Sequence, residues 1–286
     1  MYFKKWAIFC HVNGFQIMEP SVNNLLSFLT YLFKKENLGF SSINTARSAV
    51  SALVSRDQEI GKHWLICKFV RGVFNLRPAL PRRIIWDTGK VLKFFEQWHP
   101  AKNLSLYQLS IKTVMLCLLV SGQRGQTIWA MEKDKIIFEK DCAKCTITVP
   151  LKTSGPRNHV SELVFKRYKH SALCARHYLA QYSQRTEKLR GGGAKGFFIT
   201  TRSPYNTISR GTLASWTKEA MKLSGVDVNI FTPHSTRAAS TSKANVSGTV
   251  RLSTILKSAG WKNAATFAKF YNKPIEDVGW DAASLK

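Results

Sequence analysis

Acidic residues are scarce in this sequence. Aspartate and glutamate together number 17 against 43 lysines and arginines, which leaves a formal net charge of +26 and a pI near 10.1. This excess is larger than solubility requires and indicates a polyanionic partner. Residues 1–80 hold 10 basic and 4 acidic residues, and the remainder holds 33 and 13, so the larger part carries most of the charge. Because the basic residues are dispersed among aromatic ones, we expect them to line a folded surface rather than a disordered tail.

Long apolar runs are also missing. The longest, Val114 to Val120, is too short to cross a bilayer, and Met1 to Cys10 lacks the apolar region and cleavage site of a signal peptide. We therefore expect a soluble intracellular protein with no membrane partner. With 286 residues, of which 44% are hydrophobic, the chain can bury a full core and is long enough for two domains.

Cysteines are few and scattered, so no disulfide framework is expected and the thiols should be reduced, with Cys67 and Cys117 on apolar helix faces. One spacing is formally that of a zinc site, namely Cys142-x-x-Cys145 followed by Cys174-x-x-His177. We favour the alternative that these residues have a structural role, because DCAKC has the charge and length of a hairpin turn and Cys174 falls at helical spacing with apolar residues. We therefore expect no metal.

The first eighty residues show the periodicity of helices. Apolar residues recur at helical spacing after Ser21, where Gly39 suits the end of the helix, after Ser42, a candidate cap, and again from about His63. These patterns predict a small helical bundle. The segment RPALPRR, residues 77–83, has no periodicity and predicts a short stiff linker near phosphates, with the DNA-binding candidates Arg77, Arg82 and Arg83.

The remainder, residues 81–286, predicts helices around a small sheet. Helices are expected over residues 88–98, 105–120, 172–190 and 209–223. The segments KIIFE, TITVP and HVSELVF predict three antiparallel strands, and GGGAK predicts a flexible turn before a short strand FFIT. The predicted fold class is mainly α with a small antiparallel β-sheet, in two domains.

The stretch FTPHSTRAAS carries the first candidate site. Pro233 suits the first turn of a helix, and His234 and Arg237 then lie three residues apart on one helical face. A guanidinium matches a phosphate through two hydrogen bonds, and a neighbouring imidazole can add another or move a proton. Downstream, a short amphipathic helix ends at Gly260-Trp261, and ten residues after Trp261 comes Tyr271, whose phenol can act as a nucleophile.

This order, H-x-x-R, then a helix closing on Gly-Trp, then a tyrosine about ten residues later, resembles the C-terminal signature of the tyrosine recombinases, the phage-integrase-like family. The family's first arginine follows a long apolar helix in a T/S-G-x-R stretch, which Ser121 to Arg124 matches. The family's glutamate three residues later is Thr127 here. The family's lysine lies in a hairpin turn, where Lys152 in KTSGP is favoured and Lys144 in DCAKC is the alternative.

The resemblance covers residues 81–286 and implies a catalytic domain there, with residues 1–80 as a core-binding domain that completes a clamp around double-stranded DNA. It assigns six catalytic residues: Arg124, Lys152, His234, Arg237, Trp261 and Tyr271. It further implies cleavage and rejoining of DNA through a 3′-phosphotyrosyl bond without ATP, metal or other cofactor, by a homo-oligomer, a tetramer, on DNA.

The forms SGQRGQT, KTS and PHSTRAAS look closer to the recombinases of eukaryotic DIRS-type retroelements than to bacterial integrases. A nuclear location follows for such an element, and a cytoplasmic or nucleoid one otherwise. Two alternatives stay open, a domesticated DNA-binding protein that no longer recombines and a type IB topoisomerase. Residues 1–80 are shorter than the family's usual arm and Met1 begins abruptly with YFKKWAIF, so we expect the chain to be either truncated or a fragment of a larger polyprotein.

Overall fold

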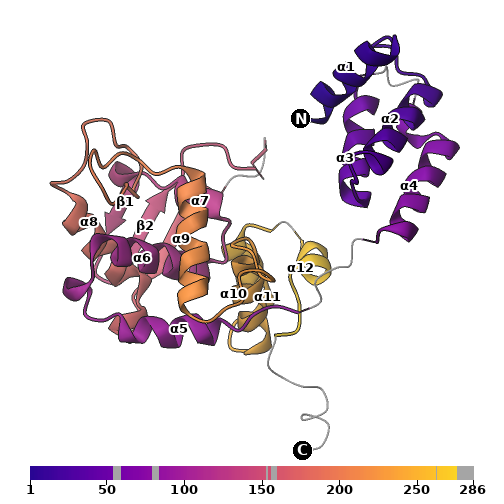
Figure 1. Cartoon of the computed structure of the whole chain (residues 1–286). Coiled ribbons are helices and arrows are strands. Elements are labelled where there is room, and N and C mark those ends of the chain that lie inside the picture. The colour runs from indigo at the N-terminus through magenta and orange to yellow at the C-terminus, as the bar shows by residue number, and fades with distance from the viewer. Residues whose placement is uncertain (54–58, 79–83, 153, 156–159, 262, 276–286) are drawn as a thin grey trace, which may run out of the picture. The chain divides into compact units, whose positions relative to one another are not determined.

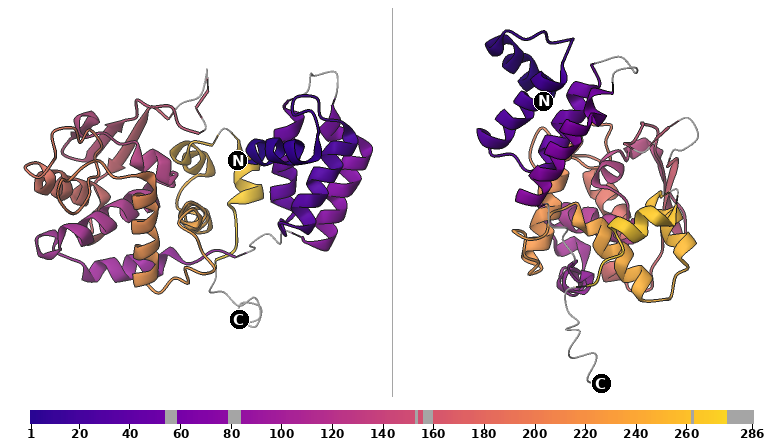
Figure 2. Two further views of the ribbon diagram at one scale, coloured as in Figure 1. Left: turned by 45° about the horizontal axis from the view of Figure 1, so that its top comes forward. Right: turned by 90° about the vertical axis from the view of Figure 1, so that its right-hand side faces the viewer.

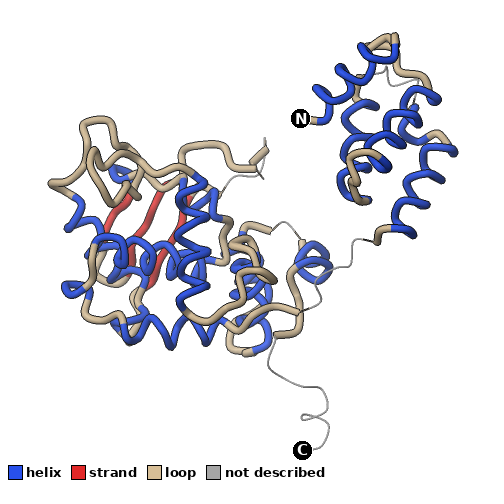
Figure 3. Tube along the Cα trace, viewed as in Figure 1, coloured by secondary structure: helices blue, strands red, loops and turns tan. Residues whose placement is uncertain are grey.

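The chain divides into two compact units, Met1–Arg82 and Arg83–Lys286 (Figure 1). The computed structural model describes residues 1–53, 59–78, 84–152, 154–155, 160–261 and 263–275. Helices dominate both units, and the only described strands form one small antiparallel sheet in the second (Figure 3). The predicted fold class, mainly α with a small antiparallel sheet, is therefore confirmed. No helix within the described ranges is long and apolar enough to cross a membrane.

The first unit is a bundle of four α-helices, α1 Tyr2–Asn13, α2 Val22–Lys34, α3 Phe40–Ser51 and α4 Trp64–Leu76, with a 3₁₀ turn η1 Ile60–Lys62. Helix α3 contacts each of the other three (Figure 2). Their apolar stripes meet in one core, which buries Trp6, Phe28, Ile43 and Ile66 among others. The periodicity of α2, α3 and α4 predicted three of these helices, and α1 was not predicted.

Two details of this unit differ from the predictions. Helix α2 already ends at Lys34, and Gly39 instead precedes α3 as its N-cap in an extended conformation, so Ser42 lies inside that helix and does not cap it. The cysteine prediction was half right, since Cys67 is exposed on α4 while Cys117 of the second unit is buried. An apolar neighbourhood in sequence does not say which face of a helix is covered.

The second unit is built around one buried helix, α6 Leu106–Ser121. A capping box of Ser105 and Gln108 starts it, and Gly122 ends it in the left-handed conformation at φ 61°. Around it lie the helices α5 Thr88–Gln97, α7 Gly125–Trp129, α8 Ala175–Thr186, α9 Arg210–Leu223, α10 Ser235–Val246, α11 Leu252–Ala259 and α12 Ala264–Phe270. Short 3₁₀ turns span η2 Ala101–Asn103, η3 Lys133–Lys135 and η4 Ser171–Leu173. Because α6 contacts α7, α8, α9 and α10, it brings segments that are far apart in the sequence close together.

The sheet has the strand order β1 Ile136–Phe138, β2 Cys142–Thr146, β3 Glu162–Lys166, with both pairs antiparallel. The prediction that DCAKC is a turn was wrong, because Cys142 to Cys145 are in β2 and the turn is residues 139–141. Ala143 and Cys145 are buried against the core, while Glu139 in the turn accepts hydrogen bonds from Lys144 Nζ at 2.7 Å and from Cys142 Sγ at 3.2 Å. The alternating residues 146–150, predicted as a strand, overlap β2 only at Thr146.

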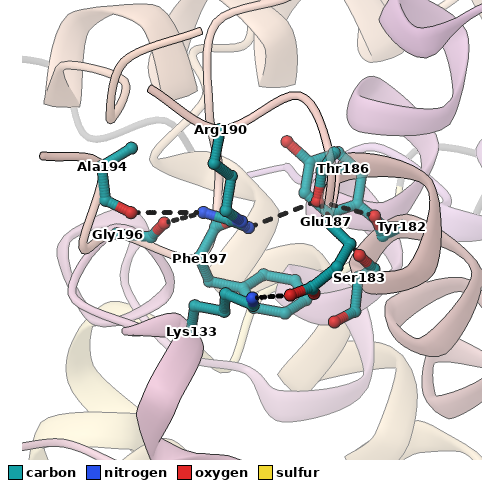
Figure 4. Close-up of polar contacts among 9 residues, drawn as sticks. All are labelled: Lys133, Tyr182, Ser183, Thr186, Glu187, Arg190, Ala194, Gly196 and Phe197. Carbon is teal, nitrogen blue, oxygen red and sulfur yellow. Dashed lines mark hydrogen bonds and ion pairs between the residues drawn. The ribbon is translucent and has the colours of Figure 1, made fainter. Parts of the chain in front are cut away.

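Helix α8 is shorter than the helix that was predicted over residues 172–190. The connection after it therefore also differs from the prediction. Arg190 holds the GGGAK segment in place, with Nη1 donating to Gly196 O at 2.7 Å and Nη2 to Phe197 O at 2.5 Å (Figure 4). Beside it, Lys133 forms an ion pair with Glu187. The segment FFIT makes only an isolated bridge, between Ile199 and Thr207, so within the described ranges it is not a strand.

Lys112 is fully buried in the middle of α6. Its ammonium donates to the carbonyls of Phe95 and Trp98, both at 2.6 Å, and to the Tyr178 hydroxyl at 2.7 Å. These three acceptors saturate an ammonium group and satisfy carbonyls at the end of α5. Burial lowers the pKa of Lys112 to about 7. This lysine is a structural cation with a complete set of partners.

Candidate active site

A cavity of about 430 Å³ opens where α6, α9 and α10 meet. Its lining includes five of the six catalytic candidates: Arg124, Lys152, His234, Arg237 and Tyr271. The sixth, Trp261, stacks against two of them, with its ring centroid 4.6 Å from that of Tyr271 and 4.2 Å from the Arg237 guanidinium carbon. Residues that are up to 147 positions apart in the sequence thus meet around one small space.

Arg237 is the most unusual group of the site. It lies in the first turn of α10 and is only 2% exposed, yet its Nε, Nη1 and Nη2 have no hydrogen-bond partner among the residues that the structure describes. Burial, and secondly the positive charge of Arg124, lowers its pKa to about 10, and the Tyr271 hydroxyl acts in the opposite direction; the Tyr271 ring centroid lies 5.3 Å from the guanidinium carbon. A buried cation without partners is costly, and an anion placed here would remove that cost.

Trp261 supplies a second buried donor, its indole Nε1, which likewise has no partner within the described ranges. Helix α11 ends at Gly260, whose φ of 70° favours glycine, and a Cβ there would lie 2.9 Å from Val160 Cγ2. The backbone N–H of Trp261 then donates to Leu256 O at 2.9 Å and closes the turn. This close-packed turn holds the indole over Arg237. The indole N–H and the guanidinium are therefore neighbouring donors that can bind the same acceptor.

Arg124 reaches the cavity from the loop that follows α6. It is the N-cap of the short helix α7, and its charge lowers the pKa of both His234 and Arg237. Gly122 allows the loop to pass close to α10, since a Cβ on it would be 2.8 Å from Thr241 Cγ2. Arg124 and Arg237, which come from different parts of the chain, therefore both place positive charge at this cavity.

His234 is the N-cap residue of α10 and keeps much of its surface exposed at the cavity. Pro233 was predicted to lie in the first turn of the helix, but it lies just before the helix. Partial burial lowers the pKa of His234, and the charges of Arg124, Arg237 and Lys152 lower it further. The imidazole is consequently neutral at pH 7, which is the state of a proton acceptor.

Tyr271 directly follows α12, as the C-cap residue of that helix. Its backbone is held at both polar groups, because its N–H donates to Phe267 O at 2.8 Å and its carbonyl accepts from Ser242 Oγ at 2.5 Å. Three residues later, Pro274 O accepts from Ile85 N at 2.9 Å. The phenol ring is therefore presented to the cavity by a segment tied to α10.

Lys152 lies exposed at the cavity rim, and its backbone N–H donates to Gln126 Oε1 at 3.3 Å. Lys144 is on β2, forms an ion pair with Glu139 at 2.7 Å, and is not among the lining residues. Of the two lysines, the structure brings Lys152 to the other candidates. Parts of the turn around it, residue 153 and residues 156–159, are outside the described residues.

Arg210, Gln126 and Gln123 are among the lining residues that were not predicted as site residues. Arg210 is the first residue of α9, and its guanidinium carbon lies 4.5 Å from the centroid of the Trp129 ring. A signal was present in the sequence, because a cation in the first turn of a helix is unfavourable next to the positive end of the helix dipole. Such a position indicates an anionic partner when no acidic residue is nearby.

Of the three DNA-binding candidates, the structure describes Arg77 alone. Arg77 donates from Nη1 to Phe33 O and Leu38 O at 3.1 and 3.2 Å, so it is engaged at the end of α2, while Arg82 and Arg83 lie outside the described residues.

The zinc alternative also finds no support. No group of three or more histidine, cysteine or acidic residues that could hold a metal occurs in the described part of the chain, and the Cys174 thiol accepts from His177 N as a helix cap.

Comparisons with known proteins show the fold. No family model and no curated protein matches the chain. Among solved structures, it is similar to a lambda integrase (75–356) dimer bound to a COC′ core site, with a TM-score of 0.60 and 16% identity over 98% of this chain and 89% of that one.

Two further solved structures are similar. The XerH site-specific recombinase bound to a palindromic difH substrate gives a TM-score of 0.60 and 12% identity over 88% and 69% of the two chains. The Tn1549 transposon integrase in complex with circular-intermediate DNA gives 0.55 and 14% over 93% and 84%. The chain therefore has the fold of the tyrosine recombinases.

Proposed function

We propose that this protein cleaves and rejoins DNA strands through a 3′-phosphotyrosyl intermediate, as a site-specific tyrosine recombinase or integrase. The observation that carries the proposal is the buried Arg237, which has three unpartnered nitrogens beside the unpartnered Trp261 Nε1 and the Tyr271 ring. An anion that fills this place completes the hydrogen bonds of both donors. A phosphodiester in the same place meets a phenol oxygen within the site.

Attack on a phosphodiester is slow because the negative charge of the phosphate repels nucleophiles. Arg124 and Arg237 supply two fixed cations for the nonbridging oxygens, and a guanidinium binds two of them at once. Arg237 and the Trp261 indole are held by packing before the substrate arrives. Little reorganisation is then needed when charge develops in the transition state.

In the proposed reaction, the Tyr271 Oη attacks the phosphorus, a new P–O bond forms, and the bond from phosphorus to the 5′ oxygen breaks. The phenol proton passes to the neutral His234, and Lys152 at the rim gives a proton to the departing oxygen. One phosphoester replaces another, so the 5′ hydroxyl of a second strand can reverse the reaction. Neither ATP nor a metal ion enters this balance.

Double-stranded DNA is the proposed partner, because a net charge of +26 attracts a polyanion. In this scheme residues 1–80 are a core-binding domain, residues 81–286 are the catalytic domain, and four copies act together on DNA. The solved structures with this fold include a lambda integrase tetramer bound to a Holliday junction, which supports the assembly only by analogy. The motif forms SGQRGQT and PHSTRAAS support a DIRS-type retroelement recombinase that acts in the nucleus.

The test uses supercoiled plasmid and pairs of labelled duplexes, in buffer with EDTA and no ATP. The wild-type protein should relax the plasmid and exchange strands between the duplexes, and Tyr271→Phe should do neither. Tyr168→Phe is the matched control, because Tyr168 is exposed in the same unit and does not line the cavity. Relaxation without strand exchange would indicate a type IB topoisomerase, and DNA binding with neither reaction a domesticated DNA-binding protein.

A further inference from the structure

Gln123, the residue before Arg124, is a buried polar side chain whose amide nitrogen and oxygen each have a hydrogen-bond partner. It is 3% exposed. Its Nε2 donates to Ser258 O, near the end of α11, at 2.6 Å, and its Oε1 accepts from Thr127 Oγ1 in α7 at 3.1 Å. The side chain therefore joins three segments, the loop after α6, helix α7 and the end of α11.

The orientation of this amide is determined by its partners. A backbone carbonyl can only accept a hydrogen bond, so the NH₂ group must face Ser258 O and the amide oxygen must face the Thr127 hydroxyl. Thr127 occupies the position where a carboxylate is expected by resemblance, and here it is a buried neutral donor to Gln123. The two hydrogen bonds from Thr127 through Gln123 to Ser258 therefore involve no charged group.

The same contact region is reinforced by the backbone. Ser258 Oγ donates to Ser121 O at 2.9 Å, and Ser121 Oγ accepts from Gln123 N at 3.2 Å. A Cβ on Gly122 would lie 3.6 Å from the Ala259 Cβ, and one on Gly260 would lie 3.5 Å from Gln123 Nε2. The Arg124 loop is thus packed directly on the turn that carries the next residue, Trp261.

We infer that Gln123 is a positioning residue, which sets the place of Trp261 over Arg237 relative to Arg124. This inference rests on the proposed function of the cavity as a phosphate site. Among the described residues, two side-chain hydrogen bonds join this loop to the end of α11, one made by Gln123 and one by Ser258. Without the Gln123 contact, the bond made by Ser258 is the one that remains. The indole and the two guanidinium groups would then no longer converge on one phosphate.

The test compares Gln123→Met and Gln123→Glu, both similar in size to glutamine. Methionine removes both hydrogen bonds, and we expect covalent adduct formation on a nicked duplex to slow by about tenfold at every pH. A carboxyl group can donate to Ser258 O only when protonated, and burial raises its pKa. Gln123→Glu should therefore match the methionine variant at about pH 8.5 and come within about threefold of wild type at about pH 6.

Thr113→Val is the matched control, since Thr113 is an equally buried hydroxyl that donates to Leu109 O at 2.6 Å within α6. It should leave the rate nearly unchanged, and all variants should keep their duplex affinity. A methionine variant at the wild-type rate, or a glutamate variant whose deficit is the same at both pH values, would overturn the inference. Because ionisation of a buried carboxyl also lowers stability at high pH, the rates are compared well below the Tm of each variant at each pH, where a role in stability alone leaves the rate unchanged.

A second measurement separates this inference from the proposed function. Sulfate should raise the melting temperature (Tm) of the wild type by filling the site, and this increase should be largely lost in Gln123→Met. If wild type responds to sulfate but forms no adduct, the proposed function fails and the sulfate comparison alone decides whether Gln123 positions the site. An equal sulfate response in both proteins would refute the positioning role, and a wild type with neither response would refute both proposals.

Discussion

Replacing Arg237 with methionine should stabilise the free protein, although the arginine is buried. Its pKa of about 10 is well below that of a free guanidinium, and at about 1.4 kcal/mol per pKa unit the charged form is disfavoured by about 3 kcal/mol. Because the folded-state pKa is depressed, the unfolded state binds more protons only above about pH 10, and the full penalty is present at neutral pH.

Methionine removes this penalty but also removes the stacking of the guanidinium on Trp261 and Tyr271, which contributes about 1–2 kcal/mol. The net gain is about 1–2 kcal/mol, or a Tm higher by about 3–6 °C for a unit of this size. Sulfate at about a hundred times its dissociation constant should stabilise wild type by about 2.7 kcal/mol and the variant far less. Sodium chloride at matched ionic strength is the control for general salt effects.

Lys112→Met provides the matched comparison, because Lys112 is an equally buried cation whose three hydrogens all have acceptors. Burial disfavours its charge too, since its pKa is lowered to about 7, but its loss removes three hydrogen bonds from a charged donor, each worth about 1.5–3 kcal/mol, so Tm should fall. The two substitutions should therefore act in opposite directions in differential scanning calorimetry. If Arg237→Met lowers Tm as Lys112→Met does, Arg237 is a structural cation and not an anion ligand.

Three further predictions concern the reaction and binding. Because its pKa is lowered, His234 should be neutral at pH 7, and the wild-type cleavage rate should fall only as pH drops below about 6.5, whereas His234→Gln should show no such dependence in single-turnover assays. Arg124→Lys keeps the charge but loses the planar pair of donors, so cleavage should drop by at least about a hundredfold with duplex affinity nearly kept, and a normal rate would remove Arg124 from the site. Arg210→Ala should reduce the slope of log K against log salt by about 0.9 if Arg210 contacts one phosphate, and an unchanged slope would exclude that contact.

The parts of the site that could be predicted from sequence are those determined locally. The three-residue spacing of His234 and Arg237, and the Gly260 turn before Trp261, depend on helix geometry and on one left-handed residue. The long apolar segment likewise predicted α6, because a helix that is apolar on every side must be buried.

What could not be predicted depends on tertiary packing. Arg210 reaches the cavity only because α9 packs against α6 and α7, which are about ninety residues earlier in the chain. The register of β2 was missed because Ala143 and Cys145, which looked like turn residues, alternate with less buried ones toward a core that the local sequence does not show. The lack of hydrogen-bond partners at Arg237 is likewise a property of the folded protein alone.

The most direct measurement is the identity of the residue that becomes attached to DNA. A library of duplexes with random sequence and a single nick is incubated with the protein in EDTA, covalent complexes are isolated under denaturing conditions, and the adduct is mapped by mass spectrometry. We predict that a DNA 3′ phosphate is attached to Tyr271 and that no adduct forms with Tyr271→Phe. An adduct on Tyr178, Tyr182 or Tyr205, or one that persists in Tyr271→Phe at equal DNA binding, would contradict this assignment.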